Sequence, residues 1–372
     1  MIRIGITGQS GFIGTHLKNV IKLNSDEFEL VDFDINFFEN QTQLDSFIEK
    51  CDVVVHLAAL NRHNDPEVIY KTNISLVSKL VSSLEKSNSK KHVIFSSSSQ
   101  EKRDNLYGKS KKDGRNILEK WASSSNNSLT GMIIPNVFGP FGNPYYNSVI
   151  ATFSFQILRN IETKIDIDAK LNLIYVDDLV SQIVIKAKNM VDEPSYNVPH
   201  TSTIRVSEIL DKLKYFKNEY IESGNIPVLN SNFELNLFNT FRSYIDLDSH
   251  FPFKLKQNND DRGSFVEIVR LGIGGQFSFS TTNKGITRGN HFHSRKIERF
   301  TVIKGKALIQ LRRIGTDNIH EFYLDGNEPS FVDMPIWYTH NIKNIGDEVL
   351  LTNFWINEPY NPENSDTFYE TV

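Results

Sequence analysis

The sequence predicts a chain of two parts, an α/β domain followed by an all-β domain. From residue 2 to about 190, short runs of β-branched residues alternate with longer amphipathic stretches, a pattern typical of βαβ units. After about residue 245, helical periodicity fades and short alternating strands follow. The polar stretch 246–253 contains Pro252 and separates the two patterns. We therefore expect domains of residues 1–245 and 246–372.

The composition describes an ordinary globular protein. The chain has 372 residues, of which 39% are hydrophobic and 23% charged, and at roughly 150 residues per domain this allows two to three domains. A net charge of −4 argues against a nucleic-acid-binding surface. The single cysteine, Cys51, fits a reducing compartment. No secretory leader and no long apolar run is present, so we expect a cytoplasmic protein without a membrane partner.

The expected strands follow from short β-branched or alternating runs. In the first half they cover residues 3–7, 28–32, 53–57, 92–96 and 129–134, and the segments between them are long enough to be crossover helices. The first half is therefore expected to form a doubly wound parallel sheet. In the second half the expected strands cover residues 264–269, 276–281, 298–303, 307–312 and 348–355.

A glycine-rich segment follows the first strand and opens an apolar helical stretch. Gly8, Gly11 and Gly14 have the spacing that allows a tight turn, close approach of a pyrophosphate and close helix–strand packing, so we predict a Rossmann dinucleotide site. Asp32 lies 18 residues after Gly14, about where a ribose-binding carboxylate is expected. It would repel a 2′-phosphate and favour NAD(H). The alternative is that Asp32 simply ends a strand in solvent.

A tyrosine and a lysine lie one helical turn apart. Tyr107 and Lys111 would share one face of a helix, where the ammonium is expected to lower the phenol pKa from about 10. The serines of residues 96–98 would supply hydroxyls at a strand end, beside the cofactor. Such a pair alone is usually a surface contact, but here it follows the glycine segment and the serines.

These motifs resemble the extended short-chain dehydrogenases/reductases that act on nucleotide sugars. Further matches are residues 56–59, 73, 135–140 and 175–178. The resemblance implies that Ser98 and Tyr107 are catalytic, with Lys111 as the electrostatic partner of the tyrosine. Dehydration is not expected, because Ser98-Ser99-Gln100 lacks the carboxylates of sugar dehydratases, and Ile133 replaces an arginine common in the group. The implied cofactor-binding residues are Gly8, Gly11, Phe12, Ile13, Gly14, Asp32, Leu57, Ala58, Ala59, Tyr107 and Lys111, and Asn136 is the implied substrate-binding residue.

The second half contains a predicted metal site. His291 and His293 would point to one face of a strand, Glu298 can return on the neighbouring strand, and His340 is a fourth candidate. Three imidazoles and a carboxylate suit zinc or a similar divalent metal. The spacing resembles the two motifs of the cupin barrel, a double-stranded β-helix, although Trp337 stands where cupins usually have glycine. The alternative is a metal-free cupin whose histidines act as bases.

Two arginine-containing segments narrow the cupin type. Residues 260–263 and 288–291 resemble segments of nucleotide 4-keto-6-deoxysugar epimerases, in which Arg262 and Arg288 would bind the substrate's phosphates. A base would then remove the proton next to the ketone. Tyr338 and Lys296 are the weak candidates for acid and base, and ordinary surface charge is the alternative for both arginines.

The whole chain resembles the bifunctional capsule enzymes of the CapF/WbjC family, through residues 146–153, 260–265, 355–360 and 366–367. The resemblance implies a homodimer that epimerises C3 of a UDP-linked 4-keto-6-deoxy amino sugar in the cupin domain. The reductase domain would then reduce C4 with NADPH, giving UDP-2-acetamido-2,6-dideoxy-L-talose, a precursor of N-acetyl-L-fucosamine for capsule or O-antigen. Asp32 suggests that NADH is also accepted. The alternatives are a dTDP-linked substrate, a 3,4-ketoisomerase, or a non-catalytic cupin used for dimerisation.

Overall fold

The chain divides into two units by its internal contacts. The computed structural model describes residues 1–87, 89–124, 126–260, 263–266, 268–269, 274–358 and 361–372. One unit comprises residues 1–152 and 165–206, and the other comprises residues 153–164 and 207–372. Residues 207–245 thus group with the β-rich unit, and the domain boundary after residue 245 stays a prediction.

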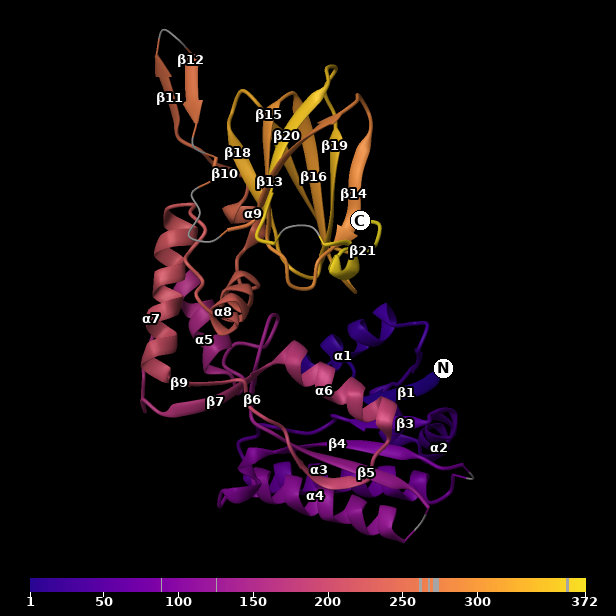
Figure 1. Ribbon diagram of the computed structural model, residues 1–372. Helices are drawn as coiled ribbons and strands as arrows, with labels where there is room; N and C mark the ends of the chain where they lie inside the picture. Colours follow the sequence, from indigo (N-terminus) through magenta and orange to yellow (C-terminus); the bar gives the residue numbers. More distant parts are fainter. Residues whose placement is uncertain (88, 125, 261–262, 267, 270–273, 359–360) are drawn as a thin grey trace. The chain divides into compact units, whose positions relative to one another are not determined.

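The first unit is built on a six-stranded parallel sheet, as predicted (Figure 1). Its strand order is β2-β1-β3-β4-β5-β8. The strands are β1 (Ile2–Thr7), β2 (Phe28–Val31), β3 (Val53–His56), β4 (His92–Ser98), β5 (Ser128–Ile134) and β8 (Glu193–Asn197). The helices are α1 (Phe12–Leu23), α2 (Gln41–Lys50), α3 (Pro66–Leu84), α4 (Leu106–Ser123) and α6 (Val176–Asn189), with 3₁₀ turns at Ile35–Glu39 and Ser99–Lys102.

Helices cover both faces of this sheet because neighbouring strand residues point to opposite sides. On β3, Val53 and Val55 join a core with α1 and α6, whereas Val54 joins a second core with α2, α3 and α4. The strand order reverses at β1, which pairs with β2 on one side and β3 on the other. The carboxyl ends of β1 and β3 therefore form the crevice in which open α/β sheets bind ligands.

A smaller sheet of three strands was not predicted. It consists of β6 (Asn136–Phe138), β7 (Lys170–Tyr175) and β9 (Ser202–Arg205), in the order β6-β7-β9. The remaining helices among the described residues are α5 (Val149–Leu158), α7 (Val206–Phe216), a π-helix (Lys217–Glu222), α8 (Asn232–Arg242), α9 (Leu247–His250) and a 3₁₀ turn (Pro362–Asn364). None of the helices in the described part of the chain is long and apolar enough to cross a membrane.

After residue 250 the second unit consists mainly of β-strands, as predicted. These strands form two antiparallel sheets that share a core. Val332 of one sheet and Ile309 and Ile342 of the other lie in that core. No strand pairing among the described residues joins the two sheets into one closed ladder. One sheet has the order β10 (Phe253–Lys254), β18 (Ser330–Met334), β15 (Glu298–Lys304), β20 (Leu350–Ile356) and β13 (Gln276–Thr282). The other has β17 (Ile319–Asp325), β16 (Lys306–Arg313), β19 (Tyr338–Asn344), β14 (Thr287–Phe292) and β21 (Phe368–Tyr369), and β11 (Gln257–Asp260) pairs with β12 (Gly263–Val266).

A buried ionic cluster fixes the helical segment of this unit to its strands. Arg299 on β15 and Asp333 on β18 are both fully buried, with Nε–Oδ1 at 2.8 Å and Nη2–Oδ2 at 3.0 Å. Tyr220 of the π-helix donates to Asp333 Oδ2 at 2.5 Å, and Arg299 Nη1 donates to the carbonyl of Gly224 at 2.7 Å. Burial acts to raise the pKa of Asp333, but Arg299, Arg242 and the hydrogen bond from Tyr220 together lower it.

Arg299→Met is expected to lower the free energy of unfolding of the second unit by about 3–5 kcal/mol, because it leaves the carboxylate of Asp333 buried without its partner. Denaturant unfolding can be followed by the fluorescence of Trp337 and Trp355 in a Trp121→Phe background. Lys304→Met is the control, because it removes an exposed cation from the same strand and should change stability little. Equal costs for the two substitutions would contradict the role of the cluster.

Candidate active sites

The glycine-rich turn lies at the crevice formed by β1 and β3. Gly8 has a φ of +79°, and a Cβ atom built there would lie 2.9 Å from the amide nitrogen of Ala58. A Cβ atom on Gly14 would lie 2.2 Å from the carbonyl oxygen of Gly8. The helix α1 begins directly after Gly11, which offers no side-chain cap to its first amides. A tight turn followed by a helix N-terminus without a side-chain cap fits the pyrophosphate of a dinucleotide.

A buried hydrogen bond holds the two strand ends together. Thr7 Oγ1 lies 2.7 Å from His56 Nδ1, and the amide of Ala58 donates to the same hydroxyl at 3.4 Å. Burial, and secondarily the charge of Lys111, lowers the pKa of His56 to about 3, so this imidazole is neutral. Thr7 was not predicted as a site residue, and nothing in the sequence marks it except its position before Gly8. Asp32 follows β2 and is exposed, which is compatible with ribose binding and with a solvated strand end.

The catalytic candidates come from the end of β4 and the start of α4. Ser98 is the last residue of β4, and Tyr107 and Lys111 lie in α4. Lys111 is buried, its Nζ donates to the carbonyl of Ser96 at 2.9 Å, and it lies 5.9 Å from the centre of the Tyr107 ring. The structure therefore brings the three candidates together.

The expected lowering of the Tyr107 pKa is wrong. Burial raises this pKa to about 12, Tyr146 adds to the rise, and a hydrogen bond with Ser98 opposes it. Burial also lowers the pKa of Lys111 to about 8, against the opposing charge of Glu101. At neutral pH the phenol is thus protonated, which is the form that donates a proton to a reduced ketone. Tyr146 was missed as a neighbour of this site because it reaches it from a distant loop.

The predicted substrate residue of this unit is accessible. Asn136 is exposed on β6, and its side-chain amide donates to the carbonyl of Asn172 at 3.4 Å. Its contact with a substrate stays a prediction.

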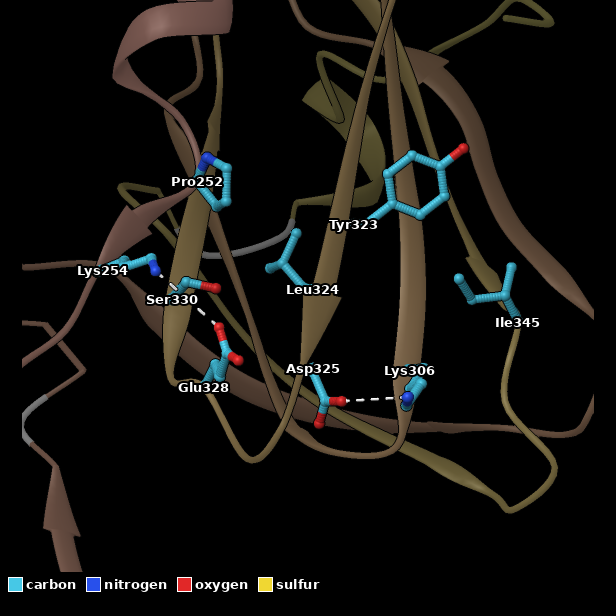
Figure 2. Close-up of a pocket in the computed structure, with 9 residues that line it drawn as sticks. All are labelled: Pro252, Lys254, Lys306, Tyr323, Leu324, Asp325, Glu328, Ser330 and Ile345. Carbon is cyan, nitrogen blue, oxygen red and sulfur yellow. Dashed lines mark ion pairs between the residues drawn. The ribbon is translucent and has the colours of Figure 1, made fainter.

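A pocket of about 280 Å³ in the second unit holds none of the predicted site residues (Figure 2). Its charged side chains pair with one another, with Lys306 Nζ at 3.5 Å from Asp325 Oδ2 and Lys254 Nζ at 4.0 Å from Glu328 Oε2. The two cations and two carboxylates that line the pocket are thus arranged as two ion pairs.

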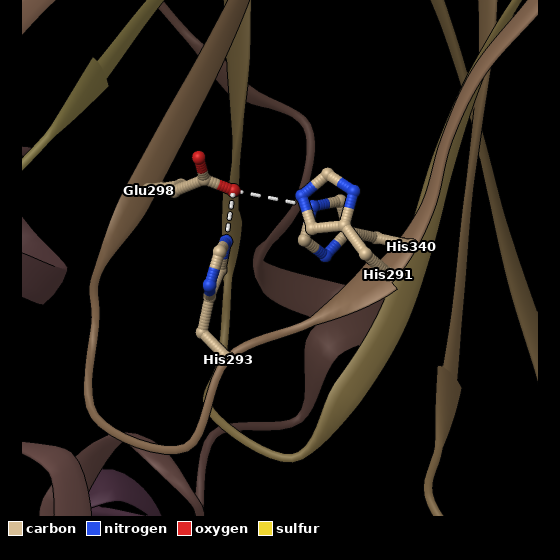
Figure 3. Close-up of side chains that lie close together, drawn as sticks. All are labelled: His291, His293, Glu298 and His340. Carbon is tan, nitrogen blue, oxygen red and sulfur yellow. Dashed lines mark ion pairs between the residues drawn. The ribbon is translucent and has the colours of Figure 1, made fainter. Parts of the chain in front are cut away.

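The four predicted metal ligands converge at one point (Figure 3). His291 on β14 pairs with His340 on β19, His293 follows β14, and Glu298 opens β15. One ligand atom from each residue lies within 4.8 Å of all the others. Glu298 Oε2 lies 3.1 Å from His293 Nε2 and 3.1 Å from His340 Nε2. The cluster thus joins both sheets of the unit.

The residues of this cluster fit a divalent metal. His293 Nε2, His340 Nε2 and Glu298 Oε2 are buried, and none of them has a hydrogen bond of acceptable geometry. Such atoms are costly to bury unless a ligand uses them, and three imidazoles with one carboxylate are donors that zinc accepts. Burial, with the nearby His340, lowers the pKa of His291 to about 4, so this imidazole is neutral, as a metal ligand must be.

Trp337, which stands where cupins usually have glycine, has a left-handed backbone conformation. Trp337 is buried, has a φ of +61°, and donates its amide to the carbonyl of His293 at 2.7 Å. This is a left-handed conformation, which normally favours glycine. Trp337 thus adopts the conformation that glycine, the usual cupin residue at this position, favours.

The structure describes only one of the two predicted phosphate-binding arginines. Arg262 lies outside the described residues. Arg288 is exposed and pairs with Ile342, and the register shifts by one residue between Gly289 and His291. This bulge places Arg288 on the sheet face that carries His291, so it is available to an anion near the cluster.

The two weak candidates for acid and base differ in their surroundings. Lys296 is buried and its Nζ donates to the carbonyl of Ser365 at 2.7 Å, which indicates a structural contact. Tyr338 is half-buried on β19, and burial raises its pKa.

Comparison with known proteins identifies relatives of both halves of the chain. Residues 4–198 match the NAD dependent epimerase/dehydratase family, and residues 258–368 match the polysaccharide biosynthesis C-terminal domain. A UDP-2-acetamido-2,6-beta-L-arabino-hexul-4-ose reductase from Pseudomonas aeruginosa is 31% identical over 369 residues, covering 99% of this chain and 98% of the relative. The spore coat polysaccharide biosynthesis protein SpsL from Bacillus subtilis is 26% identical over 123 residues, 30% of this chain and 82% of its own length.

The architecture also matches a solved structure along its whole length. The capsular polysaccharide assembling protein CapF from Staphylococcus aureus superimposes with a TM-score of 0.64 and 34% identity, covering 100% of both chains. The resemblance expected from the sequence is thus confirmed. The chain belongs to the NAD-dependent epimerase/dehydratase family and, over its whole length, to the CapF/WbjC group of nucleotide-sugar enzymes of polysaccharide biosynthesis.

Proposed function

We propose that the chain is a bifunctional enzyme that epimerises C3 and then reduces C4 of a UDP-linked 4-keto-6-deoxy amino sugar. The product is UDP-2-acetamido-2,6-dideoxy-L-talose, a precursor of N-acetyl-L-fucosamine, made in the cytoplasm by a homodimer. The observation that carries this proposal is the presence of two separate constellations in one chain, the Ser98, Tyr107 and Lys111 set and the His₃Glu cluster. The P. aeruginosa relative is a reductase of a UDP-linked 2-acetamido-hexul-4-ose, which supports the choice of sugar.

The reduction uses the residues of the first unit. Bound NAD(P)H supplies the hydride that reaches C4. Tyr107, protonated at neutral pH, donates its proton to the C4 oxygen as negative charge develops there. Ser98 holds that oxygen by a hydrogen bond, and the buried ammonium of Lys111 stabilises the tyrosinate left behind. The glycine turn and α1 orient the cofactor through its phosphates.

The epimerisation uses the residues of the second unit. His291, His293, Glu298 and His340 would hold zinc or a similar divalent ion. When bound, the ion supplies a positive charge that stabilises the enolate of the 4-ketone. Arg288 binds the diphosphate and so orients the sugar. A base removes the proton of C3, and an acid returns one to the opposite face, so the reaction leaves the composition unchanged. Tyr338 is the better of the two candidates for one of these roles.

Asp32→Ser is expected to raise the preference for NADPH over NADH by on the order of tenfold, because a carboxylate about 4 Å from a 2′-phosphate costs about 1–4 kcal/mol. The measured quantity is the ratio of kcat/KM for the two cofactors. Asp34→Ser is the matched control, since Asp34 is also exposed but accepts the amide of Asn36 at 2.8 Å. An unchanged ratio in Asp32→Ser would show that Asp32 does not contact the ribose and only ends a strand in solvent.

A substrate panel tests the proposed function. The purified enzyme is mixed with UDP- and dTDP-linked 4-keto-6-deoxy sugars and either nicotinamide cofactor, and the products are identified by NMR. We expect cofactor oxidation with the UDP-linked amino sugar and an L-talo product. A higher kcat/KM for a dTDP-linked sugar, or a product with unchanged C3, would contradict the proposal.

A further inference from the structure

The C-terminal segment returns to the strands that carry the metal ligands. β21 pairs with β14, with Tyr369 opposite His291 and Phe368 opposite Phe292. The amide of Glu370 donates to the carbonyl of Asn290 at 3.0 Å. The last residues of the chain are therefore part of the sheet that supports the cluster.

Asp366, in this segment, fixes the orientation of one ligand. It is buried, and its main-chain oxygen lies 2.5 Å from His293 Nδ1. A carbonyl oxygen can only accept, so Nδ1 must carry the proton. The lone pair of His293 is then on Nε2, the atom that lies 3.1 Å from Glu298. Partners of this kind set the tautomer and the ring orientation of metal-binding histidines.

The side chain of Asp366 holds the connection between two ligands. Its carboxylate accepts the amides of Ser294, Arg295 and Lys296 at 3.1, 3.0 and 3.1 Å, and the hydroxyl of Ser294 at 2.6 Å. These three residues lie between His293 and Glu298. The next amide, that of Ile297, donates to Asn357 Oδ1 at 2.8 Å. Every amide from residue 294 to residue 297 thus has a side-chain acceptor, which leaves this connection little freedom.

We propose that Asp366 is a positioning residue of the metal site, acting through His293 and through the turn that leads to Glu298. The inference rests on the proposed divalent metal. It implies that the C-terminal segment is a working part of the site, although it contributes none of the four ligands.

Asp366→Asn tests the proposal. The asparagine side chain keeps the size but directs an NH₂ group toward backbone donors, so the turn should loosen. We expect metal affinity to fall by about 10–100-fold, measured as zinc release to a chromogenic chelator and as a changed visible spectrum after Co²⁺ substitution. Glu363→Gln is the matched control, because it removes an exposed carboxylate from the same segment and should alter neither readout.

Ser294→Ala is a second variant that tests the same contact if Asp366→Asn does not fold. It removes only the 2.6 Å hydroxyl bond and should also speed zinc release relative to wild type. NADPH fluorescence enhancement reports that the first unit is intact in each variant. Wild-type release rates and Co²⁺ spectra in both variants would overturn the positioning role alone, whereas a wild-type protein that binds neither ion would overturn the metal site itself.

Discussion

Tyr107→Phe is expected to lower kcat for ketone reduction by on the order of 10²–10⁴-fold, while NAD(P)H still binds. The substitution removes the phenol hydroxyl, which donates the proton to the C4 oxygen, and keeps the ring beside Lys111. The rate is read from cofactor absorbance, and cofactor affinity is read from fluorescence.

Tyr196→Phe is the control for this prediction. Tyr196 lies on β8 and donates its hydroxyl to Gln182 at 2.8 Å, so its loss should leave kcat near the wild-type value. A Tyr107→Phe enzyme that retained more than about a tenth of the wild-type rate would remove this residue from the role of general acid.

Glu298→Gln is expected to slow exchange of the C3 proton by on the order of 10²–10³-fold, because it removes the carboxylate around which the histidines are arranged. Chelation of the wild-type protein should have the same effect, and added zinc should restore exchange in the chelated wild type but not in the variant. Exchange is measured by NMR in deuterated water without a nicotinamide.

Glu321→Gln is the matched control for the metal prediction. Glu321 is exposed on β17 and accepts from Gln310 at 2.8 Å, away from the cluster. Cofactor binding in the first unit should be unchanged in both glutamate variants. If the chelated protein exchanged the C3 proton at the wild-type rate, the epimerisation would not need a metal.

The features that the sequence predicts best are those that depend on residues close together in the chain. The strands around Val54 and the turn at Gly8 and Gly14 are local patterns, and the structure has both. The candidate ligands also follow from spacing, because His-x-His and the next strand's glutamate are close in the chain. The pairing of His291 with His340 then needs only antiparallel strands.

The remaining features depend on contacts between distant residues. Asp366 lies 73 positions from His293. Residues 366–367 carry part of the family resemblance, but no local pattern marks Asp366 as a neighbour of the metal ligands. The pKa of Tyr107 was expected to fall because the neighbouring lysine is visible in the sequence, whereas the burial that raises the pKa is not. The strands of the small sheet are short, such as the three residues of β6, and carry too few residues for a periodic signal.

The central claim is that one chain first epimerises C3 and then reduces C4. The most direct test is proton NMR of the wild-type enzyme with the L-configured ketosugar UDP-2-acetamido-2,6-dideoxy-β-L-arabino-hexul-4-ose in deuterated water, first without and then with NADH or NADPH. We predict that deuterium enters C3 before any reduced cofactor is added, and that the L-talo product appears once it is. Reduction of the ketone with no deuterium at C3 would contradict the account and leave the enzyme as a reductase with an accessory β-domain.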